Sequence, residues 1–128
     1  MSNVTPSQSL PLAGKTALVT GGSRSIGAAI AKRLAADGAQ VAFTYVGSPA
    51  LAEETAAAIE SAGGRALAIL ANSGEPDAVR AAVTKTVETF GGLDILVNNA
   101  GIALGGPIEQ IKFEDYQAMI ALNVTGVF

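Results

Sequence analysis

The sequence predicts an α/β domain built on a doubly wound parallel sheet. Three observations predict this fold class: short apolar runs alternate with segments of helical periodicity, a glycine-rich turn follows the first run, and Asn-Asn-Ala-Gly follows the fourth. Strict alternation of strands and helices is typical of βαβ units, whose crossovers are right-handed. A chain of 128 residues is long enough for one such domain and no more.

The first predicted strand leads into the first predicted helix. Residues 16–20 form a continuous apolar run, as expected for a parallel strand that is buried on both faces. Ile26, Ile30 and Leu34 then recur every four residues, which predicts the apolar face of a helix. Gly38 ends that helix.

The second and third strands flank a helix that begins with proline. Residues 41–45 are rich in β-branched and aromatic side chains, and residues 66–70 are a second short apolar run. Pro49 is well suited to the first helical position, where its missing N–H is not needed. The predicted apolar face of this helix consists of Leu51, Thr55, Ile59 and Ala62.

A third helix and a fourth strand complete the predicted sheet. The helix begins around residues 75–77 and ends at Gly91, and residues 94–97 form the strand. The helix is expected to bury Val79, Val83, Val87 and Phe90. A loop with glycine and proline follows, and a last helix begins near Phe113.

The predicted strand order is 3-2-1-4, as in a Rossmann-type sheet. In such sheets ligands bind at the carboxyl ends of the strands, where the winding direction changes between strands 1 and 4. The turn after strand 1 and residues 98–101 after strand 4 both lie at that point. Their convergence predicts one binding site there.

The turn after the first strand reads Thr-Gly-Gly-Ser-Arg-Ser-Ile-Gly over residues 20–27. Glycines in such a turn allow the backbone to approach a ligand, and the next helix directs its N-terminus toward an anion. This placement predicts a phosphate-binding turn. The alternative is a turn that only reverses the chain.

Composition excludes several function classes. The chain has no cysteine and no histidine, which excludes disulfides, thiolate metal sites and a Ser-His-Asp triad within it, and we expect no metal site. The net charge is −3 and the cations are scattered, so we expect no nucleic-acid partner. No apolar run reaches the roughly 20 residues of a membrane span, so we expect no membrane partner.

We expect a polar, frayed tail over residues 1–11, a dinucleotide-binding domain over residues 12–128, and a cytoplasmic location.

Residues 20–27 and 98–101 together resemble the short-chain dehydrogenase/reductase family, and most closely its 3-oxoacyl-[acyl-carrier-protein] reductase type. The resemblance extends from Leu12 to Phe128. It implies an NADP(H)- or NAD(H)-dependent oxidoreductase that moves hydride between the nicotinamide and a small carbonyl or alcohol substrate. It also implies a homodimer or homotetramer.

The resemblance assigns roles to residues of this chain. Asn123 matches a catalytic asparagine of the family. The implied cofactor-binding residues are Gly21, Ser23, Arg24, Ser25, Ile26, Gly27, Tyr45, Ser48, Asn72, Ser73, Asn98, Asn99, Ala100 and Gly101. Asn98 and Asn99 have the alternative of tying neighbouring strands together, and Asn72 that of a turn residue. Asn123 lies in an apolar segment, where a buried asparagine must find partners and is therefore catalytic or structural.

Ser25 departs from the family, which usually has glycine at that position. If the position requires positive φ, serine costs on the order of 1 kcal/mol. If the dihedral angles are helical, Ser25 is harmless, and its hydroxyl adds a donor near the diphosphate.

Arg24 favours NADP(H) over NAD(H). Enzymes that use NAD usually carry an acid at the end of strand 2, whereas residues 44–48 here contain no carboxylate. The guanidinium of Arg24 has the charge and the donors to bind a 2′-phosphate. The alternative is a solvated side chain.

The family's tyrosine and lysine pair is not found in this sequence. The two tyrosines are Tyr45 and Tyr116, and their fourth following residues are Pro49 and Ile120 rather than lysine. We therefore expect this span to be the N-terminal portion of a longer enzyme and to be inactive alone. The alternative is a non-catalytic nucleotide-binding module.

Overall fold

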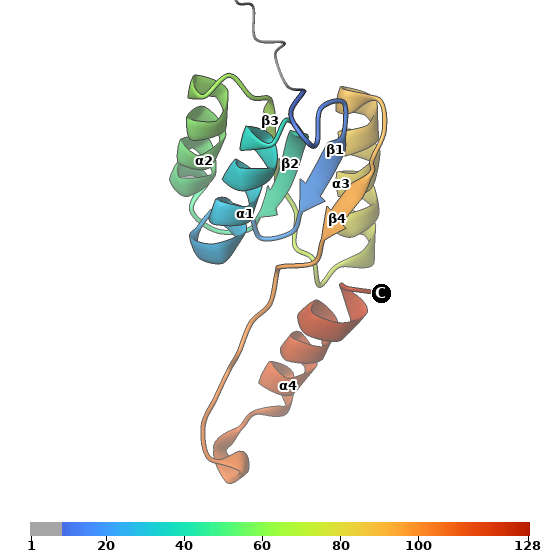
Figure 1. The fold of residues 1–128 in the computed structure, drawn as a ribbon. Helices are drawn as coiled ribbons and strands as arrows, with labels where there is room; N and C mark the ends of the chain where they lie inside the picture. Colours follow the sequence, from blue (N-terminus) through green and yellow to red (C-terminus); the bar gives the residue numbers. More distant parts are fainter. Residues whose placement is uncertain (1–8) are drawn as a thin grey trace, which may run out of the picture.

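The computed structural model describes residues 9–128, which form a four-stranded parallel sheet with flanking helices (Figure 1). The order of the strands is β3-β2-β1-β4, so the predicted order is confirmed. The strands are β1 (Thr16–Val19), β2 (Gln40–Tyr45), β3 (Ala66–Leu70) and β4 (Ile95–Val97). Each agrees with its predicted range to within one residue at either end.

β1 lies at the centre of the sheet and is fully buried. Its residue Ala17 is paired with Val41 of β2 on one side and with Ile95 of β4 on the other. Val19 and Phe43 are completely buried, and they form the core together with the small residues of the helices. The continuous apolar run of β1 is therefore explained by burial on both faces.

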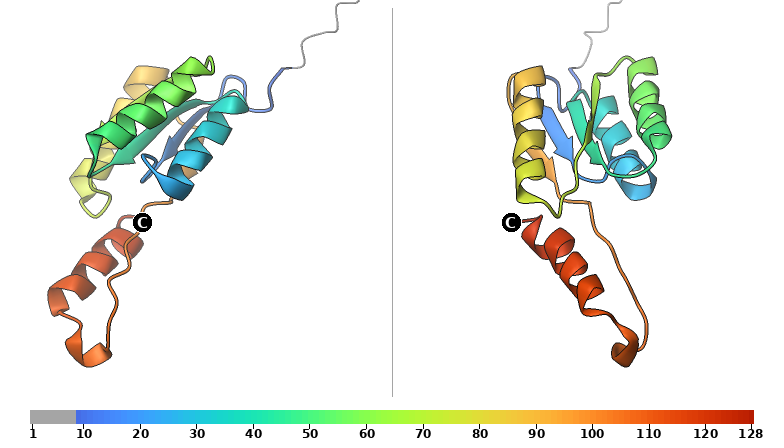
Figure 2. Two further views of the ribbon diagram at one scale, coloured as in Figure 1. Left: turned by 90° about the vertical axis from the view of Figure 1, so that its left-hand side faces the viewer. Right: turned by 180° about the vertical axis from the view of Figure 1, so that it is seen from behind.

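Helices cover both faces of the sheet. α1 (Ser25–Ala36) and α2 (Pro49–Ser61) pack side by side on one face, and α3 (Pro76–Phe90) covers the other (Figure 2). The buried side of α1 consists of Gly27, Ala28 and Ala31. Such small residues allow a helix to approach a sheet closely.

The structure corrects two of the predicted helix faces. Ile26 was predicted on the apolar face of α1, but the residue is 72% exposed, because the contact side of α1 is formed by smaller residues. Val87 of α3 is 40% exposed, and the buried positions are Ala82 and Thr86. Burial of Thr86 is possible because its hydroxyl donates to the Ala82 carbonyl at 2.8 Å.

The C-terminal quarter extends beyond the carboxyl ends of the strands. After β4 an exposed segment runs outward and returns through α4 (Phe113–Ile120) and a π-helical turn (Ala121–Thr125), which lie below the sheet in Figure 1. Within residues 9–128, no helix combines the length and the apolarity needed to cross a bilayer.

The N-terminal segment is attached to the end of α1. The predicted tail covers residues 1–11, of which residues 1–8 lie outside the described part. Residues 11–14 form a turn, and the N–H of Leu12 donates to the Asp37 carbonyl at 2.7 Å. This bond attaches the segment to the end of α1.

Candidate functional site

A cavity of about 390 Å³ lies at the carboxyl edge of the sheet. This volume is within the range of small-molecule sites. Residues from the ends of all four strands contribute to its walls. The cavity is lined by Gly21, Ser23, Arg24, Ser25, Ile26, Gly27, Thr44, Tyr45, Val46, Gly47, Ser48, Ala71, Asn72, Ser73, Asn99, Ala100, Gly101, Ile102 and Leu122. Thirteen of the fourteen predicted cofactor-binding residues are among them, and Asn98 is not.

The glycine-rich turn after β1 is held in place by hydroxyl groups of other elements. Thr44 of β2 accepts a hydrogen bond from Gly21 N through its Oγ1 at 3.1 Å, and one from Gly22 N through its carbonyl at 3.0 Å. Thr55 of α2 donates its hydroxyl to the Ser23 carbonyl at 2.9 Å, in a buried position. The turn is therefore held by hydrogen bonds from β2 and α2.

Thr20 and Asn99 join this turn to the segment after β4. The Oγ1 of Thr20 accepts the N–H groups of Asn99 and Ala100, at 3.1 and 3.0 Å. The Asn99 side-chain amide donates to the carbonyls of Thr20 and Gly21, at 3.0 and 2.9 Å. Asn99 thus ties the two strand ends together, one of the two predicted roles, and it also lines the cavity.

Two glycines are required by the close packing of the turn. Gly21 has a φ of +68°, a conformation that side chains disfavour. A Cβ on Gly27 would collide with the carbonyl of Gly21 and with the amide of Asn99. The first turn of α1 therefore packs directly against the loop before it.

The N-terminus of α1 is open toward the cavity. Its N-cap residue, Arg24, is extended and makes no side-chain cap, and the first helical bond runs from Ala28 N to Arg24 O. The N–H groups of Ser25, Ile26 and Gly27 have no acceptor among residues 9–128, and all three residues line the cavity. Free N–H groups at the positive end of a helix dipole favour an anion.

Ser25 has a φ of +50°. The structure therefore decides between the two predicted alternatives in favour of the left-handed conformation. This conformation costs a non-glycine residue on the order of 1 kcal/mol.

The cavity has a single formal charge on its walls. Arg24 is its only charged lining residue within the described chain, and no carboxylate lines it. The Arg24 side chain is exposed and has no ion-pair partner among residues 9–128. Tyr45, the last residue of β2, and Ser48, which precedes α2, also line the cavity. The cavity therefore suits an anionic ligand.

Three of the predicted cofactor-binding residues differ in the cavity that they line: Asn72, Ser73 and Asn98. The Asn72 side chain accepts a hydrogen bond from Gly74 N at 2.9 Å, the geometry of a turn residue, while the residue lines the cavity. Ser73 is buried and borders both this cavity and a second one of about 210 Å³. Asn98 lines only that second cavity, because alternate residues after a strand point to opposite faces of the sheet.

Asn123 was expected to be buried, and the structure contradicts this. The residue is exposed, because α4 and its π-helical extension lie beyond the sheet rather than against it. Its amide nevertheless has two backbone partners: Oδ1 accepts from Ile102 N at 2.9 Å, and Nδ2 donates to Ile102 O at 2.8 Å. Asn123 thus positions the segment that forms one wall of the cavity.

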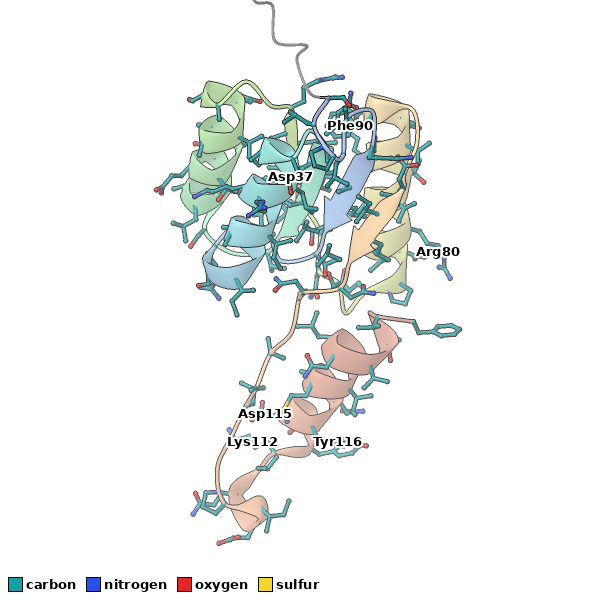
Figure 3. The ribbon with its side chains drawn as sticks, in the orientation of Figure 1. Asp37, Arg80, Phe90, Lys112, Asp115 and Tyr116 are labelled. Carbon is teal, nitrogen blue, oxygen red and sulfur yellow. The ribbon has the colours of Figure 1, made fainter. Side chains whose placement is uncertain are left out.

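Tyr116 does not line the cavity. It lies on α4 below the sheet (Figure 3), 51% exposed, and its ring stacks on Phe113 with 5.9 Å between the ring centroids. The structure therefore gives no catalytic role to this tyrosine.

The structure adds residues that the sequence prediction missed. The hydroxyls of Thr20, Thr44 and Thr55 hold the site together, although none of the three was predicted as a site residue. Their signal is a threonine near the carboxyl end of an apolar strand or on the buried side of a helix. Such a polar group must be paired when it is buried.

Comparisons with known proteins identify the family of the chain. A family model described as short chain dehydrogenase matches residues 15–128. A 3-oxoacyl-[acyl-carrier-protein] reductase of Synechocystis sp. is 44% identical over 117 residues, which are 91% of this chain and 47% of that protein. The 3beta-hydroxysteroid dehydrogenase 1 of Eggerthella lenta is also 44% identical over 117 residues, 91% of this chain and 45% of that protein.

Solved structures give the same result. A short chain dehydrogenase from Burkholderia cenocepacia J2315, in complex with NADP, is 58% identical with a TM-score of 0.89, covering 91% of this chain and 47% of that one. A metagenomic blue fluorescent protein in complex with NADPH is 49% identical with a TM-score of 0.86, covering 90% and 47%. The chain spans about half the length of the relatives it matches. It belongs to the short-chain dehydrogenase/reductase family of oxidoreductases.

Proposed function

We propose that this protein is an NADP(H)-dependent oxidoreductase acting on a small carbonyl or alcohol substrate. The observation that carries the proposal is the fixed glycine turn beside the open N-terminus of α1, with Arg24 as the only charge on the described walls of the cavity. Two solved relatives are complexes with NADP or NADPH, which supports the choice of cofactor.

The residues of the cavity fit a phosphorylated dinucleotide. The free N–H groups of the first turn of α1 would bind the diphosphate, and Arg24 with Ser48 would bind the 2′-phosphate. Asn72 and Ser73 would border the adenine, and the segment from Asn99 to Gly101 would lie beside the ribose and the nicotinamide. The bound cofactor would supply or accept hydride at its nicotinamide ring.

The substrate class and the catalytic network are part of the proposal. Relatives named for a 3-oxoacyl thioester and for a hydroxysteroid support a carbonyl or secondary alcohol, and we favour a 3-oxoacyl thioester. Asn123 would organise the proton-transfer network by holding the backbone of Ile102. We also propose a cytoplasmic homodimer or homotetramer.

The activity of the 128-residue span is a separate question from that of the whole protein. Neither Tyr45 nor Tyr116 is followed by lysine at the fourth position. We propose that the 128-residue span binds the cofactor without turning over substrate. Oxidation of NADPH by this span with 3-oxoacyl thioesters, measured by absorbance, would contradict this part of the proposal.

The choice of cofactor is tested with Arg24→Ala. Loss of a charge-assisted contact to the 2′-phosphate is worth about 1.5–3 kcal/mol, so we expect NADPH to bind at least roughly 10-fold more weakly. NADH, which lacks this phosphate, should lose less than about 2-fold. Isothermal titration calorimetry measures both affinities.

Arg80→Ala is the matched control for this test. Arg80 lies on the outer surface of α3 (Figure 3), away from the cavity, and pairs with Asp77 at 3.0 Å. Its removal changes the net charge by the same amount and should leave both affinities unchanged. An equal loss of NADPH affinity in both variants would show that only overall charge matters and would remove Arg24 from the site.

A further inference from the structure

We propose that the hydroxyl of Ser25 is a direct ligand of the dinucleotide's diphosphate. This inference rests on the proposed function, because it names a specific contact within that cofactor site. It concerns a residue of this chain at a position where glycine would be the less strained choice.

The backbone at Ser25 favours glycine, yet the residue carries a side chain. Its φ of +50° lies in the left-handed region, and Gly21, earlier in the same turn, adopts a φ of +68° as a glycine. A serine at such a position is retained at an energetic cost. The cost is offset if the side chain makes a contact that glycine does not.

Protein groups do not use the Ser25 hydroxyl. The threonine hydroxyls of the site at positions 20, 44 and 55 are each engaged by backbone groups. The Ser25 hydroxyl makes no hydrogen bond within the described chain, and the residue is exposed and lines the cavity. It is therefore available as a donor to a bound molecule.

The surroundings of Ser25 favour a phosphate oxygen as the acceptor. Ser25 is the first residue of α1, beside the free N–H groups of Ile26 and Gly27. No carboxylate among residues 9–128 lines this cavity, so no protein anion competes for the hydroxyl. A hydroxyl and several backbone N–H groups at one helix end provide the donors that a diphosphate accepts.

Ser25 and Arg24 have separable roles in this arrangement. Arg24 is proposed to bind the 2′-phosphate, which only NADPH has, whereas NADH and NADPH share the diphosphate. A change at Ser25 should therefore affect both cofactors equally, and a change at Arg24 only NADPH.

The test uses Ser25→Ala and Ser25→Gly, with calorimetric titration of NADH and NADPH. Both variants lack the hydroxyl, so each should bind both cofactors about 10-fold more weakly. Ser25→Gly also removes the strain, and its melting temperature should rise above that of the wild type. Ser61→Ala, at the exposed end of α2, is the control and should change neither quantity.

Each outcome is decisive. Wild-type affinities in both Ser25 variants would overturn the inference while leaving the proposed function intact. Wild-type binding by Ser25→Gly would also overturn it, whatever Ser25→Ala does, because the glycine variant lacks the hydroxyl. A wild-type protein that binds neither cofactor would overturn the proposed function and this inference together.

Discussion

Thr20 shows how one buried side chain organises the site. Its Oγ1 accepts two backbone N–H groups from the segment after β4 and donates to the Val97 carbonyl at 3.4 Å. Partly buried N–H groups without acceptors are costly, so this hydroxyl, together with the Asn99 amide, holds the segment against the glycine turn.

Replacing Thr20 by valine should destabilise the protein and weaken the binding of dinucleotide. The variant keeps the shape of the side chain but removes the acceptor of Ala100 N and one of the two acceptors of Asn99 N, which keeps its 3.1 Å bond to the Val97 carbonyl. We expect a cost of about 1–3 kcal/mol in the free energy of unfolding. Urea unfolding measures this change.

Thr16→Val is the matched control for Thr20→Val. Thr16 is buried in the same strand, and its hydroxyl makes no hydrogen bond within residues 9–128. Its replacement should cost less than about 1 kcal/mol. Equal destabilisation by the two variants would show that the hydroxyl of Thr20 has no special role.

At the residue scale, the sequence predicts which residues line the site better than it predicts their contacts. The glycines and Arg24 were recognised because their spacing is characteristic of the turn. Asn99 was assigned two roles because the sequence does not show which carbonyls its amide meets. Thr55 was recognised only as a helix-face residue, because its partner, the Ser23 carbonyl, lies 32 positions away.

At the scale of elements, the position of α1 depends on Gly27, a residue without a side chain. The helix begins so close to the preceding turn that a Cβ there would collide with the Gly21 carbonyl and the Asn99 amide. Both groups are held in place by hydrogen bonds. Gly21 N donates to the Thr44 hydroxyl, and the Asn99 amide donates to the Thr20 carbonyl. The position of the helix N-terminus therefore depends on this glycine.

Gly27→Ala should move α1 away from the turn. We expect a loss of about 2 kcal/mol or more in the free energy of unfolding, as for other overpacked sites, and at least roughly 10-fold weaker binding of NADPH. Gly92→Ala is the control, because a Cβ at Gly92 meets no atom within 4 Å and its φ is not positive. Similar effects of both substitutions would contradict the proposed close contact.

α4 is connected to the cavity through Asn123. Its side-chain amide forms a pair of hydrogen bonds with the backbone of Ile102, and a Cβ at Gly101 would lie 3.2 Å from its Oδ1. The extended segment after β4 and the end of α4 lie side by side in both views of Figure 2. Asn123 therefore acts on the cavity through the backbone.

Asn123→Ala should loosen this segment without unfolding the sheet. We expect the Ile102 amide proton to exchange about 10-fold faster, because its acceptor is lost, while amides of β1 keep their protection. Thr125→Ala, two residues further along the same exposed turn, should have no effect. Unchanged exchange at Ile102, measured by NMR, would show that the amide pair does not hold the segment.

The sequence predicted the ranges of the helices and strands well, from periodicity and from the positions of glycine and proline. It predicted less well which helix residues are buried. α1 and α3 bury alanine, glycine and threonine, and they expose Ile26 and Val87. A hydrophobic pattern gives more weight to large side chains, but helices packed closely on a sheet favour small ones. The burial predicted for Asn123 failed because it depends on what covers α4, which local sequence does not specify.

At the scale of the whole molecule, the candidate site occupies one end of the sheet, and the buried core runs along its central strands. The carboxyl edge carries the cavity, the open helix end and Arg24. Near the other end, the Arg65 guanidinium packs 5.0 Å from the ring centroid of Phe90, which lies at the end of α3 distant from α4 (Figure 3). This separation allows residues of the site to remain strained while the core maintains the fold.

The strand order was predictable because two motifs, after strands 1 and 4, require neighbouring strand ends. The exposure of β4, whose Leu96 is 52% exposed, was less evident, since its apolar run resembles a central strand. The position of α4 beyond the sheet was not predicted at all, because it is set by contacts distant in sequence, such as that between Ile102 and Asn123.

The central claim is that the free N–H groups at the start of α1 bind the diphosphate of a dinucleotide beside the segment after β4. A crystal structure of the protein soaked with NADPH tests it most directly. We predict diphosphate oxygens within hydrogen-bond distance of the Ile26 and Gly27 N–H groups, with the 2′-phosphate next to Arg24. An empty cavity, or NADPH bound at another surface with its diphosphate away from α1, would contradict the account.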